Sequence, residues 1–480
     1  MKVFIGIDLG TSAIKGALIA ENGKKIALGK RTTSFLFPQK GFVELSPEAL
    51  YANFVSLLTE LSSKVPKGDT IAAVSMSAAS GNVTLMDRDG EPVHNIISWL
   101  DGRAMGKTAE ILPGFDPSSV YRVVGWPWVE DFPLAHLAWL KKYEPDVLRK
   151  ASRIGMNSDW LLSRLTGCFA MDPSTATTFY FQDQLSRTWY KPHMDLIGID
   201  KEALPELKDS GSIMGTITAQ ASHDTGIPEG VPVVLGSFDH PSAARGTGVF
   251  SEGTMLLSCG TSWVGFYPFA SREAGLKQFL LIDPFKTPDG PWGMMFSIAQ
   301  VGKNIDYYVD TFLGPLSKGT GRYALFDGAA AGVAEGSHGL FINPVMDGFE
   351  EHIKDIFAQH QHGEVSRAIM EGTVYEFRQR MESLQKAGFR SERAVMVGGP
   401  SESPIWPSIV ANVLGMDITL INGQTAGAVG AAVMASVGIG CFETEEEAFD
   451  AMGGKGRVVH ADERLNRIYN EFFADYMERR

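Results

Sequence analysis

One six-residue pattern occurs twice in this chain of 480 residues, at positions 250 residues apart. The first copy is Ile7-Asp8-Leu9-Gly10-Thr11-Ser12 and the second is Leu257-Ser258-Cys259-Gly260-Thr261-Ser262. In each copy an apolar run of strand type reaches a tight turn, and a second apolar run follows. A period this long predicts two duplicated domains and not a solenoid of short repeats. Coincidence is the alternative, because Gly-Thr-Ser is also a common turn sequence.

Length and composition agree with two large folded domains. A chain of 480 residues suggests two to four domains of about 100–200 residues each. Hydrophobic residues make up 44% of the chain and charged residues 21%, which excludes extensive disorder. The predicted domains are residues 1–245 and 246–480, because the opening pattern returns just after Gly253.

Charge and cysteine content exclude several functional classes. The net charge of −13 argues against electrostatic binding of nucleic acid. The three cysteines are far apart and lack metal-ligand spacing, so we expect a reducing, cytoplasmic compartment. The first apolar run reaches Asp8 too early for a signal peptide, and no uncharged stretch is long enough to span a membrane. We therefore expect no nucleic-acid partner and no membrane partner.

Strand and helix signals alternate along the chain and predict an α/β fold. Ser46 is a typical N-cap, and Pro47 suits the first position of the helix that should follow. A long helical pattern covers residues 134–164, and small residues open a further helix at Ala426. The expected strands are 3–7, 14–19, 26–35, 71–76, 83–86, 231–236, 254–258, 263–269, 394–397 and 418–421.

The two Gly-Thr-Ser turns are candidate phosphate sites. Glycine lets the backbone approach a ligand closely, and exposed N–H groups and hydroxyls can donate hydrogen bonds to phosphate oxygens. The candidate residues are Gly10, Thr11 and Ser12 in the first turn and Gly260, Thr261 and Ser262 in the second. Asp8 could hold Mg²⁺ through water. Ordinary turn formation is the alternative explanation for each turn alone.

Gly398-Gly399 follows a predicted strand and precedes a predicted helix. Bare backbone at such a place can lie against a base or a ribose, and close packing of the helix on the strand is the alternative. The chain contains no Gly-x-x-x-x-Gly-Lys-Ser/Thr sequence, which excludes a P-loop. The first strand is not followed by the Rossmann pattern Gly-x-Gly-x-x-Gly either.

Asp239 follows a buried strand and precedes a predicted helix start. A carboxylate there can accept a proton from a hydroxyl during phosphoryl transfer, and helix capping is the alternative role. Further polar groups occur in Trp99-Leu100-Asp101-Gly102-Arg103 and in the segment that begins at Asp172. Together such groups suit a polyhydroxylated ligand, although each alone is also common in turns and surface ion pairs.

Taken together, these residues resemble the FGGY family of carbohydrate kinases, and the similarity extends over essentially the whole chain. It includes Gly6 to Ser12, the element from Trp99 to Arg103, Asp172-x-Ser174-x-Ala176, Gly236 to His240, Ser258 to Ser262, Gly398-Gly399 with Trp406, and Ala426 to Ala432. The resemblance implies two actin-like, ribonuclease H-like ATPase domains with a cleft between them. It also implies ATP-dependent phosphorylation of a small sugar.

The resemblance assigns roles to individual residues. The N-terminal domain would bind the sugar and would carry the first phosphate turn, and the C-terminal domain would bind the nucleotide. Asp239 would be the general base and Asp8 would organise Mg²⁺. ATP and its phosphates would contact Gly10, Thr11, Ser12, Gly260, Thr261, Ser262, Gly398, Gly399 and Ser403. The sugar would contact Asn82, Trp99, Asp101, Arg103, Asp172, Asp239 and His240.

The chain departs from the family pattern at several positions. Pro400 replaces a glycine that is frequent after Gly398-Gly399, and Thr425 replaces an acid before the Ala-Gly-Ala stretch. Part of the family's second signature is absent at residues 355–360, and the sugar-binding loop at 77–82 lacks a histidine that is frequent in xylulose kinases. We expect a ketopentose or a ketohexose as the acceptor. A polyol or aldonate kinase and a non-catalytic ATP-binding regulator are the alternatives, and a homodimer is one possible assembly.

Overall fold

The apolar runs on either side of Gly10 form β1 (Lys2–Leu9) and β2 (Ala13–Ala20), which pair antiparallel. β3 (Lys25–Thr32) continues this meander, and β5 (Thr70–Ala78) pairs parallel with β1. β14 (Pro232–Phe238) pairs parallel with β5, and with β13 (Ile213–Thr216) the sheet has the order β13-β14-β5-β1-β2-β3. The predicted strands of this part of the chain are therefore confirmed.

The structure is a computed structural model that describes residues 1–316, 321 and 323–479. The chain divides into two units. Unit 1 consists of Met1–Phe250, Ser271–Gly293 and Thr425–Gly454, and unit 2 of Ser251–Ala270, Met294–Gln424 and Lys455–Arg480. The domain boundary after residue 245 stays a prediction.

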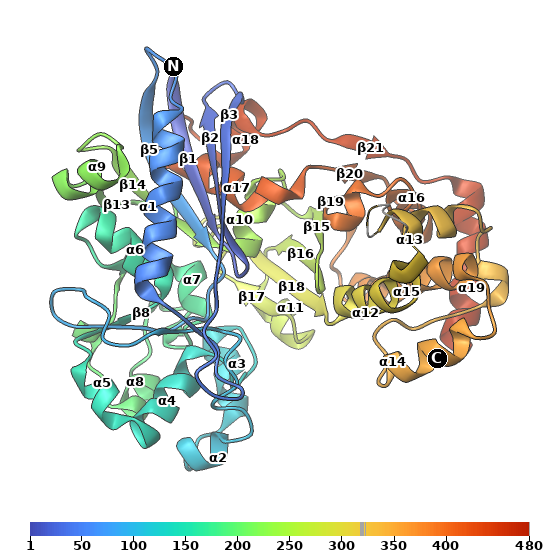
Figure 1. Cartoon of the computed structure of the whole chain (residues 1–480), viewed down its shortest axis with the longest axis horizontal. Helices are drawn as coiled ribbons and strands as arrows, with labels where there is room; N and C mark the ends of the chain where they lie inside the picture. Colours follow the sequence, from blue (N-terminus) through green and yellow to red (C-terminus); the bar gives the residue numbers. More distant parts are fainter. Residues whose placement is uncertain (317–320, 322, 480) are drawn as a thin grey trace. The chain divides into compact units, whose positions relative to one another are not determined.

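Helices cover both faces of the sheet in unit 1. α1 (Pro47–Ser63) begins as predicted, because Ser46 accepts a hydrogen bond from the Ala49 amide and Pro47 occupies the first helical position. Figure 1 shows α1 in blue along the strands, and its buried leucines and Phe54 pack against the odd-numbered residues of β1. α17 (Ala426–Gly438) packs on the other face. A Cβ at Gly6 would lie 1.8 Å from the Ala428 carbonyl oxygen, so only glycine permits this approach.

Unit 2 repeats the topology of unit 1. β15 (Gly253–Cys259) and β16 (Trp263–Phe269) pair antiparallel around the turn at Gly260, and β19 (Ser391–Gly398) pairs parallel with β15. β20 (Ile418–Leu420) pairs parallel with β19, and the order within the unit is β18-β16-β15-β19-β20-β21, with β18 at Trp292–Ile298 and β21 at Arg457–Val459. The strands next to each Gly-Thr turn thus have the same order and directions, which confirms the predicted duplication.

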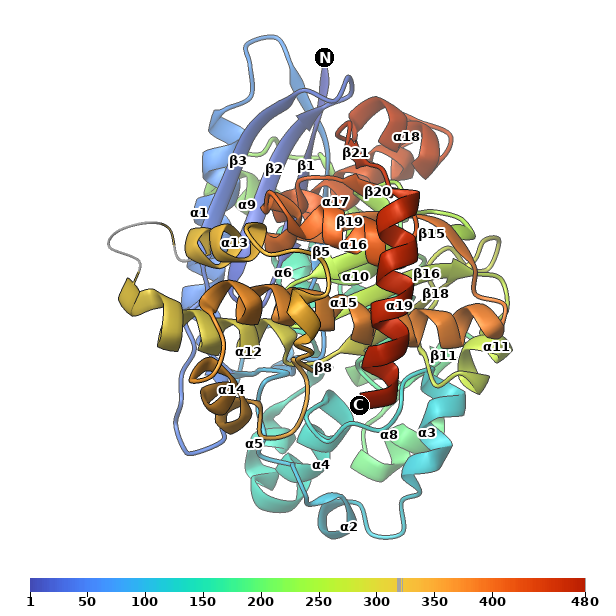
Figure 2. The same ribbon diagram turned by 90° about the vertical axis from the view of Figure 1, so that its right-hand side faces the viewer.

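The helices of unit 2 surround this sheet. Figure 2 shows α19 in red running across α15, and the rings of Tyr375 in α15 and Tyr469 in α19 lie 6.5 Å apart. The helices are α12 (Val301–Tyr308), α13 (Ala324–Ala331), α14 (Phe349–Phe357), α15 (His362–Lys386), α16 (Trp406–Leu414) and α19 (Glu463–Arg479). α16 is followed by Gly415, whose φ of 66° is typical of a glycine that ends a helix.

The remaining elements of unit 1 are short. The strands are β4 (Glu44–Leu45), β6 (Thr84–Met86), β7 (Ile96–Ile97), β8 (Arg153–Gly155), β9 (Ala170–Met171), β10 (Gln182–Asp183), β11 (Thr188–Trp189), β12 (Glu206–Leu207) and β17 (Leu281–Asp283). The helices are α2 (Thr108–Ile111), α3 (Pro117–Val124), α4 (Pro133–Tyr143), α5 (Pro145–Lys150), α6 (Asn157–Thr166), α7 (Pro173–Thr177), α8 (Lys191–Ile197), α9 (Ala219–Thr225), α10 (Asp239–Arg245), α11 (Arg272–Lys277) and α18 (Glu445–Met452).

The continuous helical pattern expected over residues 134–164 is wrong in part. The segment divides into α4, α5, β8 and α6. Pro145 cannot continue α4, because proline lacks the N–H that an interior helical position donates. Among the described residues, no helix is both long and apolar enough to cross a membrane.

Candidate functional site

Asp8 lies near the end of β1, where it faces its neighbours on two strands. It is opposite Lys15 in β2 and Ser77 in β5. Ser77 Oγ donates a hydrogen bond of 3.3 Å to Asp8 Oδ1, and Lys15 Nζ is 3.7 Å from Asp8 Oδ2. Burial raises the pKa of Asp8 to about 6, although the charge of Lys15 opposes this shift.

The start of α17 closes over the same carboxylate. A Cβ added at Gly427 would lie 2.9 Å from Asp8 Cγ and 3.0 Å from Ser77 Oγ. The small residues that open α17 therefore allow the helix to approach Asp8 closely. The sequence predicted this close packing but not the residue that it encloses.

Asp239 is the first residue of α10 and directly follows β14. The N-cap of α10 is Phe238 and Asp239 is the first helical residue, so Asp239 is not the capping residue of α10. Asp239 Oδ1 is buried and has no hydrogen-bond partner within the described part of the chain. Burial raises the pKa of Asp239, whereas His240 and Lys15 lower it. The negative charge of Asp239 in turn raises the pKa of Asp8, so the two carboxylates interact.

Asp8 fits a metal ion that arrives with a nucleotide. Mg²⁺ is usually held by one or two carboxylates together with substrate phosphates and water. Asp8 supplies one such carboxylate, two residues before Gly10 of the first Gly-Thr turn. The described residues contain no group of three or more His, Cys, Asp or Glu side chains that could hold a metal by themselves. The donor set thus fits a metal shared with phosphates and not an all-protein cage.

Trp99 connects the first Gly-Thr turn with the neighbouring loop. Its indole Nε1 donates to Thr11 Oγ1 at 3.1 Å, and its backbone amide donates to Asn82 Oδ1 at 3.2 Å. Asn82 Nδ2 donates to the Ala79 carbonyl at 3.0 Å. The Gly10 amide closes the turn on the Ala13 carbonyl at 3.1 Å. Four predicted site residues are therefore brought together here.

Asp101 and Arg103 form a buried ion pair instead of an open site. Arg103 Nε donates to Asp101 Oδ1 at 2.8 Å, and Arg103 Nη2 donates to Glu44 Oε1 at 2.6 Å. The guanidinium also lies 4.3 Å from the centre of the Phe42 ring, and its side chain is only 1% exposed. Asp101 Oδ2 accepts from the Val43 amide at 2.6 Å. The geometry gives the pair a structural role, and direct contact of either residue with a sugar stays a prediction.

Asp172 and His240 occupy different surroundings. Asp172 is the N-cap of α7, since its Oδ1 accepts from the Thr175 amide at 2.9 Å, and it is 5% exposed. The ring of His240 lies 5.4 Å from the ring of Phe238, beside Asp239. His240 is partly exposed whereas Asp172 is buried, so a ligand could reach His240 more easily.

The second Gly-Thr turn lines a cavity of about 440 Å³ within unit 2. Gly260, Thr261, Gly399 and Ser403 are the predicted site residues on its wall. Gly398 lies behind the wall with φ of 101°, and a Cβ there would be 2.0 Å from the Cys259 carbonyl oxygen. A side chain at this position would be strained and would clash with that carbonyl, so the position requires glycine. Ser262 is in the turn and its carbonyl accepts from the Gly260 amide at 3.1 Å.

Sequence reasoning missed much of this nucleotide-sized cavity. Gly302 in α12 touches the turn closely, and its amide donates to the Thr261 carbonyl at 2.9 Å. Ser403 Oγ donates to Asp327 Oδ1 at 2.8 Å, and burial raises the pKa of Asp327. The other missed wall residues are Cys259, Trp263, Ile305, Asp306, Tyr323, Phe326, Pro400, Glu402 and Trp406. A glycine in the first turn of a helix can indicate a close approach to another segment, and this was the one signal in the sequence that could have placed Gly302 in the cavity wall.

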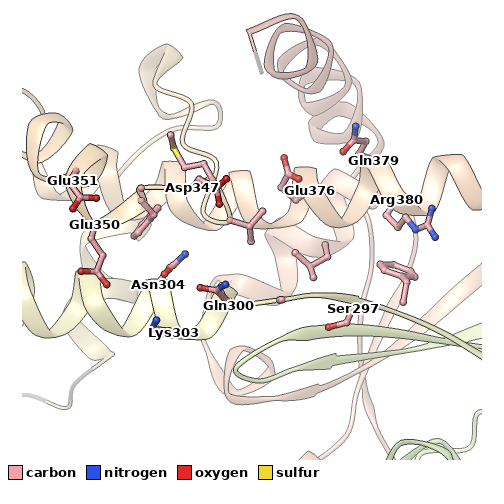
Figure 3. A pocket seen from close by; sticks show the side chains of 17 residues that line it. Ser297, Gln300, Lys303, Asn304, Asp347, Glu350, Glu351, Glu376, Gln379 and Arg380 are labelled. Atoms are coloured by element: carbon pink, nitrogen blue, oxygen red, sulfur yellow. The ribbon is translucent and has the colours of Figure 1, made fainter. Parts of the chain in front are cut away.

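A cavity of about 580 Å³ lies on another side of α12 in unit 2. Figure 3 shows Gln300, Lys303 and Asn304 of this region below Glu376, Gln379 and Arg380 of α15. No predicted site residue lines it. The predicted residues gather in two groups, one in each unit, and the cleft expected between the domains stays a prediction.

Two family models match nearly all of the chain. Residues 3–246 match the N-terminal domain of the FGGY family of carbohydrate kinases, and residues 255–439 match the C-terminal domain of the same family. The N-terminal model covers the first Gly-Thr turn, Asp8 and Asp239, and the C-terminal model covers the second Gly-Thr turn.

Individual relatives differ in the substrate that they are named for. The chain is 27% identical over 457 residues to the xylulose kinase of Lactococcus lactis, covering 93% of this chain and 90% of that protein. It is 25% identical over 508 residues to the autoinducer-2 kinase of Klebsiella pneumoniae, covering 99% and 93%. The crystal structure of gluconate kinase from Lactobacillus acidophilus covers 100% of this chain and 97% of its own, with 21% identity and a TM-score of 0.86.

Proposed function

Because the chain belongs to the FGGY family of carbohydrate kinases, we propose that it transfers the γ-phosphoryl group of ATP to a hydroxyl of a ketopentose or a ketohexose, with Asp239 as the general base. The family has two actin-like ATPase domains, and the repeated strand order of the two units agrees with that fold. The chain is accordingly a carbohydrate kinase, and the identity of its acceptor is the open part of the proposal.

One observation carries the role of Asp239. Its Oδ1 is buried without a hydrogen-bond partner in the described residues, at the end of a strand and beside Asp8. A buried oxygen of this kind is costly unless a ligand supplies a donor. The hydroxyl of an acceptor is such a donor, and the raised pKa of Asp239 brings the carboxylate closer to a proton-accepting role near neutral pH.

The proposed reaction exchanges one phosphorus–oxygen bond for another. The acceptor oxygen forms a bond to the γ-phosphorus, the bond from that phosphorus to the bridging oxygen breaks, and ADP leaves. Asp239 takes the proton of the hydroxyl. The backbone and hydroxyls of Gly10, Thr11, Ser12, Gly260, Thr261 and Ser262 hold phosphate oxygens, while Gly398, Gly399 and Ser403 shape the adenosine side. Mg²⁺, when bound near Asp8, would offset phosphate charge.

The acceptor side of the proposal includes Asn82, Trp99, His240 and Asp239. Asp101 and Arg103 support the loop that carries Trp99, and Asp172 caps α7 behind the site. A polyol or aldonate acceptor is the alternative, because one similar structure is that of a gluconate kinase. A cytoplasmic location and a homodimer also stay predictions.

Coupled ADP release tests the function directly. Mg-ATP would be supplied with a panel of ketopentoses, ketohexoses, polyols and aldonates. We expect turnover with a ketose, and a fall of roughly 10²–10⁴ in kcat for Asp239→Asn. Asp195→Asn is the matched control, since this exposed carboxylate pairs with Lys191 on the surface of α8.

Three other outcomes have definite meanings. Turnover only with an aldonate or a polyol would replace the ketose. Undiminished turnover in Asp239→Asn would remove Asp239 as the base. ATP binding without turnover on any acceptor would favour the non-catalytic regulator.

A further inference from the structure

The backbone amide just before Asp239 is held by a side chain, although Phe238 is still paired with Ala78 of β5. The parallel pairing of β14 with β5 is irregular between Leu235 and Phe238. The Phe238 amide instead donates a hydrogen bond of 3.2 Å to Ser174 Oγ. Ser174 belongs to α7 and is fully buried, so water cannot replace this contact.

Ser174 is itself oriented by a second buried residue. Ser174 Oγ donates to Asp283 Oδ2 at 2.6 Å, and Asp283 in β17 is also fully buried. A hydroxyl has one hydrogen, so donation to Asp283 turns a lone pair toward the Phe238 amide. Burial raises the pKa of Asp283 to about 7, and above this pH the ionised carboxylate makes a bond that is shorter and stronger than a neutral one, which makes the orientation firm. Asp283 has no cap or turn role, and its Oδ1 has no partner among the described residues.

The far end of α10 is anchored by Arg245, which also reaches Ser237 Oγ in β14 at 3.4 Å. Arg245, its last residue, donates from Nη2 to the Phe285 carbonyl at 2.5 Å and from Nε to Glu445 Oε1 at 2.8 Å. The short helix that carries Asp239 is therefore fixed at its end by Arg245 and just before its start by Ser174. The contact from Ser174 holds the amide of Phe238, the residue next to Asp239.

We propose that Ser174 and Asp283 are positioning residues for Asp239: the chain of hydrogen bonds from the Phe238 amide through Ser174 to Asp283 fixes the backbone from which the general base projects. This inference rests on the proposed function. A displacement of about 1 Å at a reacting group can cost up to roughly 10²-fold in rate, so the contact has catalytic consequences without touching the substrate.

The test compares four variants in the ADP-release assay, with the acceptor that gives turnover in the panel. For Ser174→Ala and Asp283→Ala we expect kcat to fall about tenfold, with KM for ATP and for the acceptor within about twofold of wild type. Asp283→Asn keeps an oxygen that can accept from Ser174, so it should restore most of the lost kcat. The double variant Ser174→Ala/Asp283→Ala should be no slower than either single variant, because both remove one connected unit.

Ser436→Ala is the control for loss of a buried hydroxyl. Ser436 is fully buried in α17 and donates to the Val433 carbonyl of its own helix, at 2.7 Å. It should leave kcat unchanged. If Ser174→Ala does not fold, Ser174→Cys keeps the volume with a weaker hydrogen-bonding group and should still lower kcat.

The pH profile separates positioning from general destabilisation. The acid limb of the pH profile of kcat reports the pKa of the general base, Asp239. This limb should move in Ser174→Ala and should not move in Ser436→Ala. Unchanged kcat and an unchanged acid limb in both Ser174 variants, with a wild-type enzyme that turns over, would overturn the inference alone. No turnover by the wild-type enzyme on any acceptor would instead overturn the proposed function.

Discussion

The indole nitrogen of Trp99 donates a hydrogen bond of 3.1 Å to the hydroxyl of Thr11. The hydroxyl oxygen of Thr11 thus accepts a hydrogen bond from the loop that is proposed to bind the acceptor. The hydroxyl hydrogen of Thr11 stays available for donation to a ligand. The turn proposed to hold phosphate and the loop proposed to hold the sugar are joined within unit 1 by this contact.

Trp99→Phe removes that hydrogen bond and keeps an aromatic ring in the loop. Loss of one neutral hydrogen bond changes a free energy by about 0.5–1.5 kcal/mol, so kcat/KM for the acceptor should fall roughly threefold to tenfold. The ADP-release assay measures this. Trp160→Phe is the control, because the Trp160 indole nitrogen is buried without a partner among the described residues. Equal effects of the two substitutions would show that Trp99 acts only through packing.

The carboxylates of the site were predictable because strand ends can be recognised. Asp8 and Asp239 both follow continuous apolar runs, and parallel neighbouring strands bring such residues to one edge of a sheet. The duplicated turn also indicated that two sheets would share one topology. Neither conclusion needed long-range contacts to be known.

The surroundings of Arg103 could not be predicted in the same way. Its partner Glu44 lies 59 residues earlier in the chain, and nothing in the local pattern links them. A Trp-x-Asp-Gly-Arg element looks alike whether its charges face a ligand or each other. The wall residues Asp306 and Asp327 were missed for a similar reason, because each is a single acid in an amphipathic helix whose orientation depends on packing.

Arg103→Met should destabilise the protein by about 3–5 kcal/mol, because Asp101 and Glu44 would be left buried without their cation. Urea unfolding measures the change. The control Arg149→Met removes an exposed cation that pairs with Asp146 on the surface, and it should have little effect. If the Arg103→Met variant folds, we expect its KM for the acceptor to stay within about threefold of the wild-type value. A KM about tenfold higher at unchanged stability would make Arg103 a direct ligand.

The pKa of Asp8 predicts an acid limit to activity. Burial raises this pKa to about 6, and only the ionised carboxylate can hold a cation. Activity should therefore be lost as the pH falls through about 6. Lys15→Met removes a charge that lowers the pKa values of Asp8 and Asp239, so the acid limb should move to higher pH. Profiles of kcat/KM for ATP between about pH 5 and about pH 9 measure the shift.

Lys67→Met is the control for this pH experiment, because Lys67 is exposed in a loop. Its acid limb should coincide with that of the wild type. An acid limb in Lys15→Met that moves to lower pH, or does not move, would contradict the electrostatic role of Lys15.

The contact of Gly302 with the second turn predicts a defect confined to the nucleotide. A Cβ at Gly302 would lie 2.6 Å from the Gly260 carbonyl oxygen and 2.7 Å from Thr261 Cα, so Gly302→Ala must move α12 away from the turn. We expect KM for ATP to rise about tenfold and calorimetric binding of ADP to weaken by a similar factor. KM for the acceptor should stay near its wild-type value, since Gly302 lines the cavity of unit 2 that contains this turn. Gly328→Ala is the control, because a Cβ at this position of α13 meets nothing within 4 Å. Equal affinity for ADP in Gly302→Ala and the wild type would place the nucleotide elsewhere.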